Sequence, residues 1–153
     1  MRRISFADMN CSVAQALEII GEWWTLLILR DSFLGIRRFD DFVERLGISR
    51  NVLTDRLDTL VDAGILERHT YDVARCRYDY LLTDKGRALW PVLVTLRQWG
   101  DEWVTGPGNE PLLLEHRDHG HTTTALLTCD VCGEPLNVRS VRAVSGPGAE
   151  TDA

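Results

Sequence analysis

The spacing between apolar residues changes along the chain, and each spacing predicts a different element. Up to residue 62, apolar positions recur every three or four residues, which predicts amphipathic helices. After Ala63-Gly64 the interval shortens to two, as in a half-buried strand, and helical spacing returns after Thr83. The expected helices cover about Ser12–Ile20, Trp23–Leu34, Asp84–Leu89 and Trp90–Val104, and two further helices end at Leu46 and begin after Ser49. The expected strands lie within Ile65–Tyr71 and Tyr78–Leu82. The pattern therefore predicts a mainly α fold with a small β hairpin.

Two of these helices are joined by a tight turn. Gly47 can end the first, and the side-chain oxygen of Ser49 can accept a hydrogen bond from the N–H groups that begin the second. Leu53, Leu57 and Leu60 give the second helix an apolar face. This helix-turn-helix pattern predicts that the opposite, polar face meets base edges in a DNA groove. The residues expected there are Ser49, Arg50, Asn51, Thr54 and Asp55, with Arg56 near a phosphate.

The hairpin after the second helix carries basic residues at its tip. Arg75 and Arg77 lie in the tip segment Asp72–Arg77, where guanidinium groups can reach phosphates. Arg37 and Arg38 precede the helix-turn-helix in a short extended piece that could add a third strand and clamp the flanking DNA. A helix-turn-helix followed by such a hairpin is a winged helix.

Three stretches of the chain resemble one known family. They are IGEWWTLLILRDSFLGIRRFDDF, GISRNVLTDRLDTLVDAGILERHTY and YLLTDKGRALWPVLVTLRQWGDEW, in this order. They are similar to the HxlR-type bacterial transcription regulators, relatives of the MarR regulators, over about Asn10 to Trp103. The resemblance implies a winged-helix DNA-binding protein that dimerises through its terminal helices. The dimer seam expected on this basis contains Val13, Leu17, Leu93, Leu96, Trp99 and Trp103.

Composition and charge limit the function classes. With 153 residues, 44% of them hydrophobic and 26% charged, the chain is long enough for one domain and a small appendage. It has no apolar run of membrane-spanning length and no secretory signal at its start, so we expect a cytoplasmic protein without a membrane partner. We find no nucleophile elbow, phosphate-binding glycine loop or paired carboxylates in an apolar setting, so we do not expect an enzyme.

The net charge of −6 is unfavourable for DNA binding when averaged over the chain. However, residues 37–77 contain as many arginines as carboxylates, and the acidic excess lies in the C-terminal third. Because affinity depends on the charge that faces the phosphates, the local balance permits DNA binding.

A second unit is expected after the turn-rich linker 105–111. Residues 112–144 contain the knuckle Cys129-Asp130-Val131-Cys132-Gly133, and zinc would need two further ligands beside Cys129 and Cys132. His119 and His121 are the candidates, in a zinc-ribbon-like appendage with structural zinc. The alternative is a degenerate ribbon that packs without metal.

Two features suggest regulation. Cys11 precedes the first helix, where the resemblance implies a redox or electrophile sensor in some members of the family, and the alternative is a small packed residue at the seam. The tryptophans could line a pocket for a small aromatic effector, although aromatic residues at helical spacing are commonly core residues.

We therefore expect a homodimeric, sequence-specific repressor with double-stranded operator DNA as its partner. Its parts would be an N-terminal arm (1–10), a DNA-binding and dimerisation domain (11–104), the linker, the ribbon-like unit and a disordered tail (145–153). The alternatives are a winged-helix module for protein–protein interaction without DNA affinity, and a zinc or redox sensor.

Overall fold

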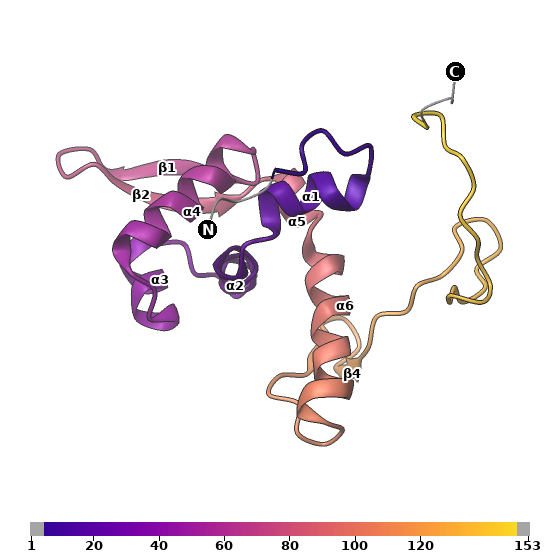
Figure 1. Ribbon diagram of the computed structural model, residues 1–153. Helices are drawn as coiled ribbons and strands as arrows, with labels where there is room; N and C mark the ends of the chain where they lie inside the picture. The colour runs from indigo at the N-terminus through magenta and orange to yellow at the C-terminus, as the bar shows by residue number, and fades with distance from the viewer. Residues whose placement is uncertain (1–4, 150–153) are drawn as a thin grey trace. The chain divides into compact units, whose positions relative to one another are not determined.

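The computed structural model describes residues 5–149, in which the expected helices and hairpin occur in the expected order (Figure 1). The predictions for residues 1–4 of the arm and 150–153 of the tail lie outside the described residues. A π-helical turn, η1 (Asp101–Thr105), follows the last helix directly. The helices are α1 (Ser12–Ile20), α2 (Trp23–Phe33), α3 (Phe39–Leu46), α4 (Arg50–Asp62), α5 (Asp84–Arg87) and α6 (Trp90–Gly100), and the strands are β1 (Leu66–Asp72), β2 (Arg77–Leu82), β3 (Leu114–His116) and β4 (His121–Thr123).

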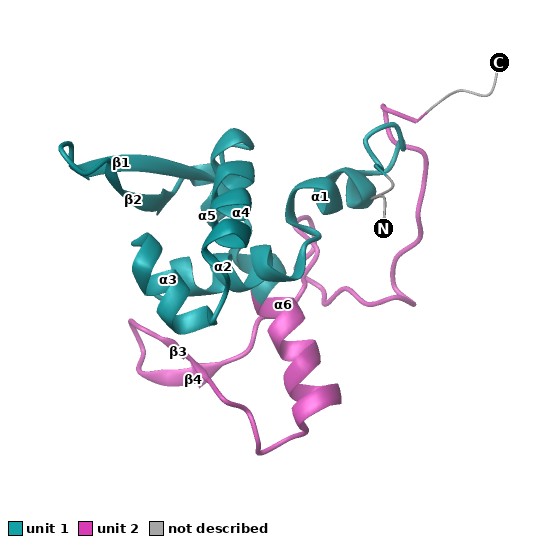
Figure 2. Cartoon of the chain, turned by 60° about the vertical axis from the view of Figure 1, so that its left-hand side comes forward, with its two compact units in different colours: residues 1–93 teal, residues 94–153 magenta. Residues whose placement is uncertain are grey.

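The chain divides into two compact units, Met1–Leu93 and Val94–Ala153, so that α6 contains the boundary between them (Figure 2). The first unit holds the helix-turn-helix and the hairpin, and the second holds β3 and β4. No single helix within residues 5–149 has the length and apolarity to cross a membrane. Only α1 and α2 taken as a pair meet that test of length and composition, and the pair is bent by 78°.

The core of the first unit fixes the orientation of α4. Leu53, Leu57 and Leu60 recur on one face of this helix, and all three are completely buried. Burial of each such side chain stabilises the fold by about 1.5–3 kcal/mol, so the opposite face of α4 is turned outward. The leucines pack in one cluster with Ile20, Ile28, Leu29, Phe42, Ile48, Ile65, Leu66 and Tyr80.

The turn between α3 and α4 uses the residues that were predicted for it. Gly47 has a φ of +63°, a left-handed conformation that costs other residues about 1–2 kcal/mol. Its N–H donates to the carbonyl of Val43 at 3.0 Å and closes α3. The Ser49 Oγ accepts a hydrogen bond from the N–H of Val52 at 3.4 Å and opens α4. The turn therefore places the N-terminus of α4 directly after the end of α3.

Strands β1 and β2 pair antiparallel and form the wing. Leu66 lies opposite Leu82 at its base, and Asp72 lies opposite Arg77 at its tip. The register shifts just before the tip, after Thr70, as at a β-bulge. The wing tip is thus the turn of residues 73–76 together with the paired strand ends Asp72 and Arg77.

The expected third strand is reduced to a single bridge. Arg38 pairs with Asp79 of β2, and the N–H of Tyr80 donates to the carbonyl of Arg37 at 2.7 Å. Because α3 begins at Phe39, the extended segment is too short to continue the ladder.

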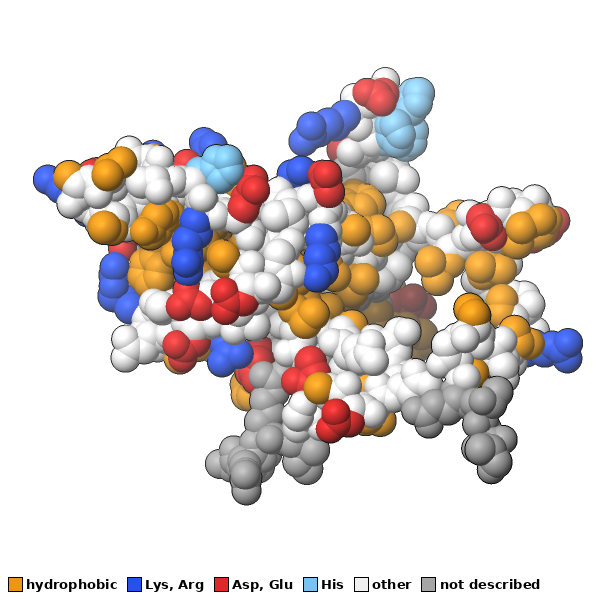
Figure 3. Space-filling model, turned by 90° about the horizontal axis from the view of Figure 1, so that it is seen from above, with side chains coloured by type: hydrophobic (Ala, Val, Ile, Leu, Met, Phe, Trp, Pro, Cys, Tyr) orange, Lys and Arg blue, Asp and Glu red, His pale blue; other side chains and the backbone are white. Residues whose placement is uncertain are grey.

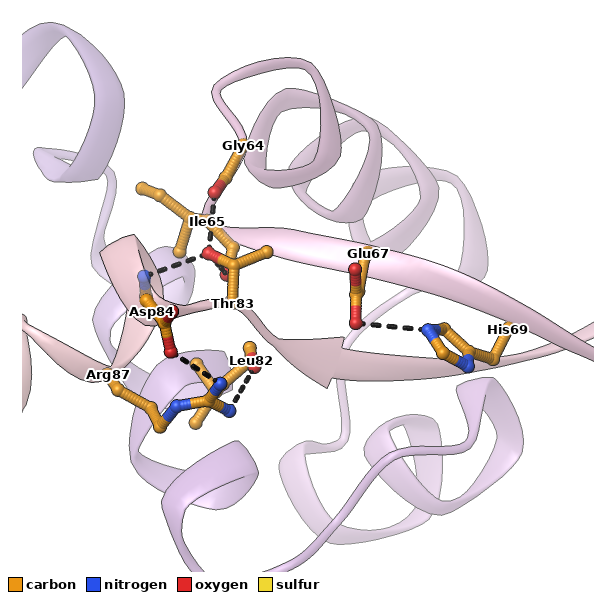
Figure 4. Close-up of polar contacts among 9 residues, drawn as sticks. Gly64, Ile65, Glu67, His69, Leu82, Thr83, Asp84 and Arg87 are labelled. Carbon is orange, nitrogen blue, oxygen red and sulfur yellow. Dashed lines mark hydrogen bonds and ion pairs between the residues drawn. The ribbon is translucent and has the colours of Figure 1, made fainter.

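Thr83 fixes the base of the wing to α5 (Figure 4). Its hydroxyl donates to the carbonyls of Gly64 at 2.6 Å and Ile65 at 3.1 Å, and it accepts from the N–H of Gly86 at 3.1 Å. A Cβ at position 86 would lie 2.2 Å from the Ile65 oxygen, so only glycine allows this close approach. The wing is therefore anchored at one end and projects at the other.

In the second unit, two side chains of α6 hold the chain that follows. The Gln98 amide donates to the carbonyl of Ala125 at 3.0 Å and accepts from its N–H at 2.8 Å. Arg97 donates to the carbonyl of Leu112. β3 and β4 pair as a short antiparallel hairpin between these two anchor points.

Candidate nucleic-acid interface

The polar face of α4 is exposed over the first half of the helix. Asn51, Thr54 and Asp55 lie on the side opposite the buried leucines, and Ser49 and Arg50 before them are also exposed. A side-chain amide such as that of Asn51 offers a donor and an acceptor together, the combination that reads the edge of adenine in the major groove. The helix thus presents hydrogen-bonding groups at its N-terminal end, as a recognition helix does.

Arg50 is held by a carboxylate and an aromatic ring. Its guanidinium donates to Asp40 Oδ1 at 2.8 Å and lies 4.8 Å from the centroid of the Phe39 ring. The Arg50 side chain remains 65% exposed. Because an exposed ion pair contributes only about 0–1 kcal/mol, a phosphate or a base can replace Asp40 as its partner.

Arg56 is mostly covered and has a carboxylate partner within the protein. Its side chain is only 22% exposed, and its Nη1 lies 3.9 Å from Glu22 Oε1, just before α2. This ion pair joins α4 to the start of α2. The expected phosphate contact of Arg56 therefore gains no support from the structure.

The wing tip presents two arginines to solvent. Arg75 and Arg77 are exposed, and within residues 5–149 neither guanidinium forms an ion pair with a carboxylate. The backbone N–H of Arg75 donates to Asp72 Oδ1 at 3.1 Å, which shapes the turn and leaves the guanidinium free to move. These side chains can therefore reach a phosphate without first giving up a partner in the protein.

A hollow of about 430 Å³ lies between the wing tip and the N-terminal ends of α3 and α4. Its walls include Arg38, Arg50, Arg75 and Arg77, with the ring of Tyr71 beside them. Figure 3 shows Lys and Arg side chains at the wing end of this surface, with carboxylates among them. Asp40 and Asp41 also line the hollow, so four arginines outnumber two carboxylates in its walls. This excess of positive charge favours a sugar–phosphate backbone.

The two flanking arginines share one carboxylate. Arg37 and Arg38 lie 3.8 and 3.4 Å from the oxygens of Asp79, and the Arg38 guanidinium lies 4.7 Å from the centroid of the Tyr71 ring. Both arginines are more than half exposed. Arg38 lines the groove, whereas Arg37 lines a second hollow next to Ile36 and Tyr80.

Comparison with known sequences decides the family. Residues 19–107 match the family model described as HxlR-like helix-turn-helix. The chain belongs to the HxlR-like helix-turn-helix family. It is 44% identical over 137 residues to an uncharacterized HTH-type transcriptional regulator of Mycobacterium tuberculosis (strain ATCC 25618 / H37Rv), which covers 90% of this chain and 87% of the relative. A similar regulator of Synechocystis is 33% identical over 105 residues, covering 68% of this chain and 78% of the relative. The family is one of transcription regulators and not of enzymes.

Solved structures show the same fold. The crystal structure of PA1607, a transcription-factor candidate, superposes with a TM-score of 0.83 at 36% identity and covers 94% of this chain and all of that one. The redox regulator HypR in its reduced form superposes with a TM-score of 0.55 at 30% identity, over 59% of this chain and 90% of HypR. The resemblance to HxlR-type regulators and the winged-helix-like fold are therefore confirmed.

The residues expected at the dimer seam of this HxlR-like chain are mostly exposed. Trp99 and Trp103 keep 58% and 69% of their surface exposed although both are large and apolar. Leu93, by contrast, packs against the core of the first unit, so it has less surface to offer a partner. The exposed members of the set are Val13, Leu17, Leu96, Trp99 and Trp103.

The structure does not test the two predictions about regulation, which concern Cys11 and an effector pocket lined by tryptophans. Cys11 is an exposed free cysteine at the N-cap of α1, where its side chain forms no capping hydrogen bond. Neither the hollow beside the wing nor a second one of about 290 Å³, next to Ile36 and Tyr80, is lined by tryptophan. The aromatic effector pocket and the sensing role of Cys11 stay predictions.

The residues expected to bind zinc lie in separate turns. Cys129 and Cys132 share one turn, in which the backbone N–H groups of Cys132 and Val131 hold the pKa of the Cys129 thiol below its ordinary value. His119 and His121 belong to the β3–β4 hairpin. Within residues 5–149, no group of three or more His, Cys, Asp or Glu side chains is gathered around a point that could hold a metal ion. The structure therefore does not assemble the expected tetrad.

Proposed function

We propose that this HxlR-like protein is a homodimeric repressor that binds a specific site in double-stranded DNA and blocks access to a promoter. The exposed polar face of α4 carries the proposal. Its first half holds Asn51, Thr54 and Asp55 in the open, while the leucines behind them are buried and keep the helix rigid. The exposed guanidinium groups of Arg75 and Arg77, which form no ion pair within residues 5–149, would hold the wing on the backbone beside it.

Dimerisation is supported by the apolar surface of the terminal helices. Tryptophans as exposed as Trp99 and Trp103 are unfavourable in water and are enriched at the centres of protein interfaces. A two-fold dimer would present two copies of α4, and the half-sites would then lie about one helical turn apart, ~34–36 Å.

The α4 docking is tested with matched substitutions on the same helix. Thr54 and Thr59 each donate their hydroxyl to the carbonyl four residues earlier, at 2.9 and 2.8 Å, but only Thr54 lies in the N-terminal half. We expect Asn51→Ala and Thr54→Ala to weaken binding to the cognate duplex by about 1–3 kcal/mol and to relax base preference. Thr59→Ala should bind like wild type.

The measurement is a fluorescence anisotropy titration with duplexes from the DNA beside the protein's own gene. If Asn51→Ala and Thr54→Ala bound as tightly as Thr59→Ala, α4 would not be the recognition helix. The alternative, a protein–protein module, is favoured by the net charge of −6. Such a module would bind no duplex in a salt-dependent manner.

Control of this binding by oxidation is a second proposal. Cys11 is exposed at the start of α1, and the similar HypR is a redox regulator. We expect an oxidant to change the DNA affinity of wild type and of Cys76→Ser, but not that of Cys11→Ser. An affinity of wild type that does not respond to oxidant would contradict a sensing role.

A further inference from the structure

The chain from Leu112 to Ala149 is ordered into turns and strands with almost no core of its own. No side chain in this stretch is buried, and only Leu114, Ala125 and Cys129 are partly covered. Apolar side chains such as Val131 are left 90% exposed. Small units with so little apolar burial commonly depend on a metal, a disulfide or a partner for stability.

Two turns in this stretch share a hydrogen bond from the fifth residue to the first and a left-handed glycine at the fifth position. In His116-Arg117-Asp118-His119-Gly120, the N–H of Gly120 donates to the carbonyl of His116 at 2.8 Å, and Gly120 has a φ of +65°. In Cys129-Asp130-Val131-Cys132-Gly133, the N–H of Gly133 donates to the carbonyl of Cys129 at 2.9 Å, and Gly133 has a φ of +75°. Each turn thus places a metal-ligating residue first and fourth, and a left-handed glycine fifth.

Both turns are also tips of antiparallel pairs. His116 pairs with His121 across the β3–β4 hairpin. In the second turn, the N–H of Cys129 donates to the carbonyl of Glu134 at 2.8 Å, next to a bridge that joins Thr128 and Pro135. His116 therefore corresponds to Cys129 and His119 to Cys132, whereas His121 corresponds to Glu134 and lies outside the turn.

This geometry matches the two halves of a zinc ribbon. Each turn brings two ligands to one side, and zinc in a structural site takes four nitrogen or sulfur ligands from two such turns. The ring centres of His116 and His119 lie 4.5 Å apart. Two imidazoles on one tetrahedral zinc would have ring centres roughly 5 Å apart, given a Zn–N distance of about 2.0–2.1 Å. The ring of His121 lies 5.7 and 5.8 Å from the other two, so the distances between rings do not by themselves choose the ligands, and the correspondence of the two turns does. All three histidines are exposed, and Figure 3 shows a group of His side chains on the surface.

We propose that His116, His119, Cys129 and Cys132 bind one structural Zn²⁺ ion. This set differs from the tetrad expected from the sequence, because His116 takes the place of His121. Within residues 5–149 the four side chains are not gathered around one point, so metal binding requires the two turns to approach each other and Ala125 to give up its hydrogen bonds to Gln98. The segment 120–128 between the turns is long enough for this approach, since an extended chain spans roughly 3.3–3.6 Å per residue. With four protein ligands no position remains for water, so the ion stabilises the second unit and performs no catalysis.

The proposal is tested by cobalt titration of the full-length protein, stripped of metal, in a Cys11→Ser/Cys76→Ser background that removes the two other thiols. We expect one Co²⁺ per chain, with the visible bands of a tetrahedral ion and a thiolate-to-cobalt charge-transfer band, and displacement by one Zn²⁺. His116→Ala should weaken binding by more than about 100-fold, because even loss of an outer-shell partner costs about 10–100-fold.

His121→Ala is the matched control, and it should bind cobalt as tightly as the background protein. The proposal is overturned if His121→Ala loses the metal while His116→Ala keeps it. It is also overturned if binding survives Cys129→Ser without a charge-transfer band, or if the background protein binds no cobalt. These outcomes do not depend on DNA binding, so failure of the zinc proposal would not contradict the proposed function.

Discussion

At the scale of single residues, a buried carboxylate joins α2 to the helix-turn-helix. Asp31 is completely buried, and its two oxygens lie 2.8 Å from Arg30 and 3.3 Å from Arg45 of α3. Both arginines are about half exposed, so solvent screens the pairs, and their contribution is smaller than that of a fully buried ion pair. Asp31 therefore stabilises the fold by holding α3 against α2.

Asp31→Asn tests this role because it keeps the size of the side chain and removes its charge. We expect the free energy of unfolding to fall by about 1–3 kcal/mol, since the substitution replaces one buried acceptor oxygen with an amide donor that cannot accept a hydrogen bond from an arginine. Urea denaturation followed by circular dichroism measures it. The control is Asp84→Asn, which breaks the exposed ion pair with Arg87 and should leave stability unchanged. Equal effects of the two changes would argue against a special role of Asp31.

The sequence predicted the roles of residues that act locally better than it predicted contacts between residues far apart in the chain. Gly47 and Ser49 act within a few residues of their own position, so the local pattern was sufficient to predict them. The ion pair of Arg56 with Glu22 could not be predicted, because nothing local indicates that the distant Glu22 lies beside it in the fold. His116, which we propose as a zinc ligand, was not among the ligands expected from the sequence, although the spacing of two residues between the His or Cys pair, and the glycine that follows, recur in both turns.

At the scale of elements, α4 and the wing have different tasks. The helix is held by completely buried leucines, whereas the wing is anchored at Thr83 and projects at its tip. A helix packed on a buried face suits base readout, and exposed arginines suit contacts with phosphates, which carry no direct sequence information.

Arg75→Ala tests the task of the wing. We expect it to weaken binding to all duplexes alike and to reduce the slope of log K against log salt concentration by about one. The control Arg142→Ala removes an exposed arginine from the second unit and should leave the slope unchanged. A loss confined to one DNA sequence would instead assign Arg75 to base readout.

At the scale of the whole molecule, function depends on surface that the single chain leaves uncovered. Sequence periodicity predicted the apolar face of α6, but it could not show that Leu93 packs inward while Trp99 and Trp103 stay exposed. That division follows from packing of the first unit. The net charge of −6 likewise conceals a local balance, since the arginines gather around the hollow at the wing.

Trp99→Ala tests the dimer. We expect it to shift the protein toward monomer in analytical ultracentrifugation and to weaken binding to a two-fold symmetric site more than to a half-site, because only the full site uses both copies. Trp23→Ala removes another exposed tryptophan, 84% exposed on α2 and outside the proposed seam, and should leave the dimer intact. A wild-type monomer in solution would refute the seam.

The most direct test of the account is selection of binding sites from a random library of duplexes by the full-length protein. We predict enrichment of a two-fold symmetric sequence whose half-sites lie about one helical turn apart, and loss of that enrichment in Asn51→Ala. No enrichment by the wild-type protein over the starting library would contradict the claim that paired α4 helices read DNA.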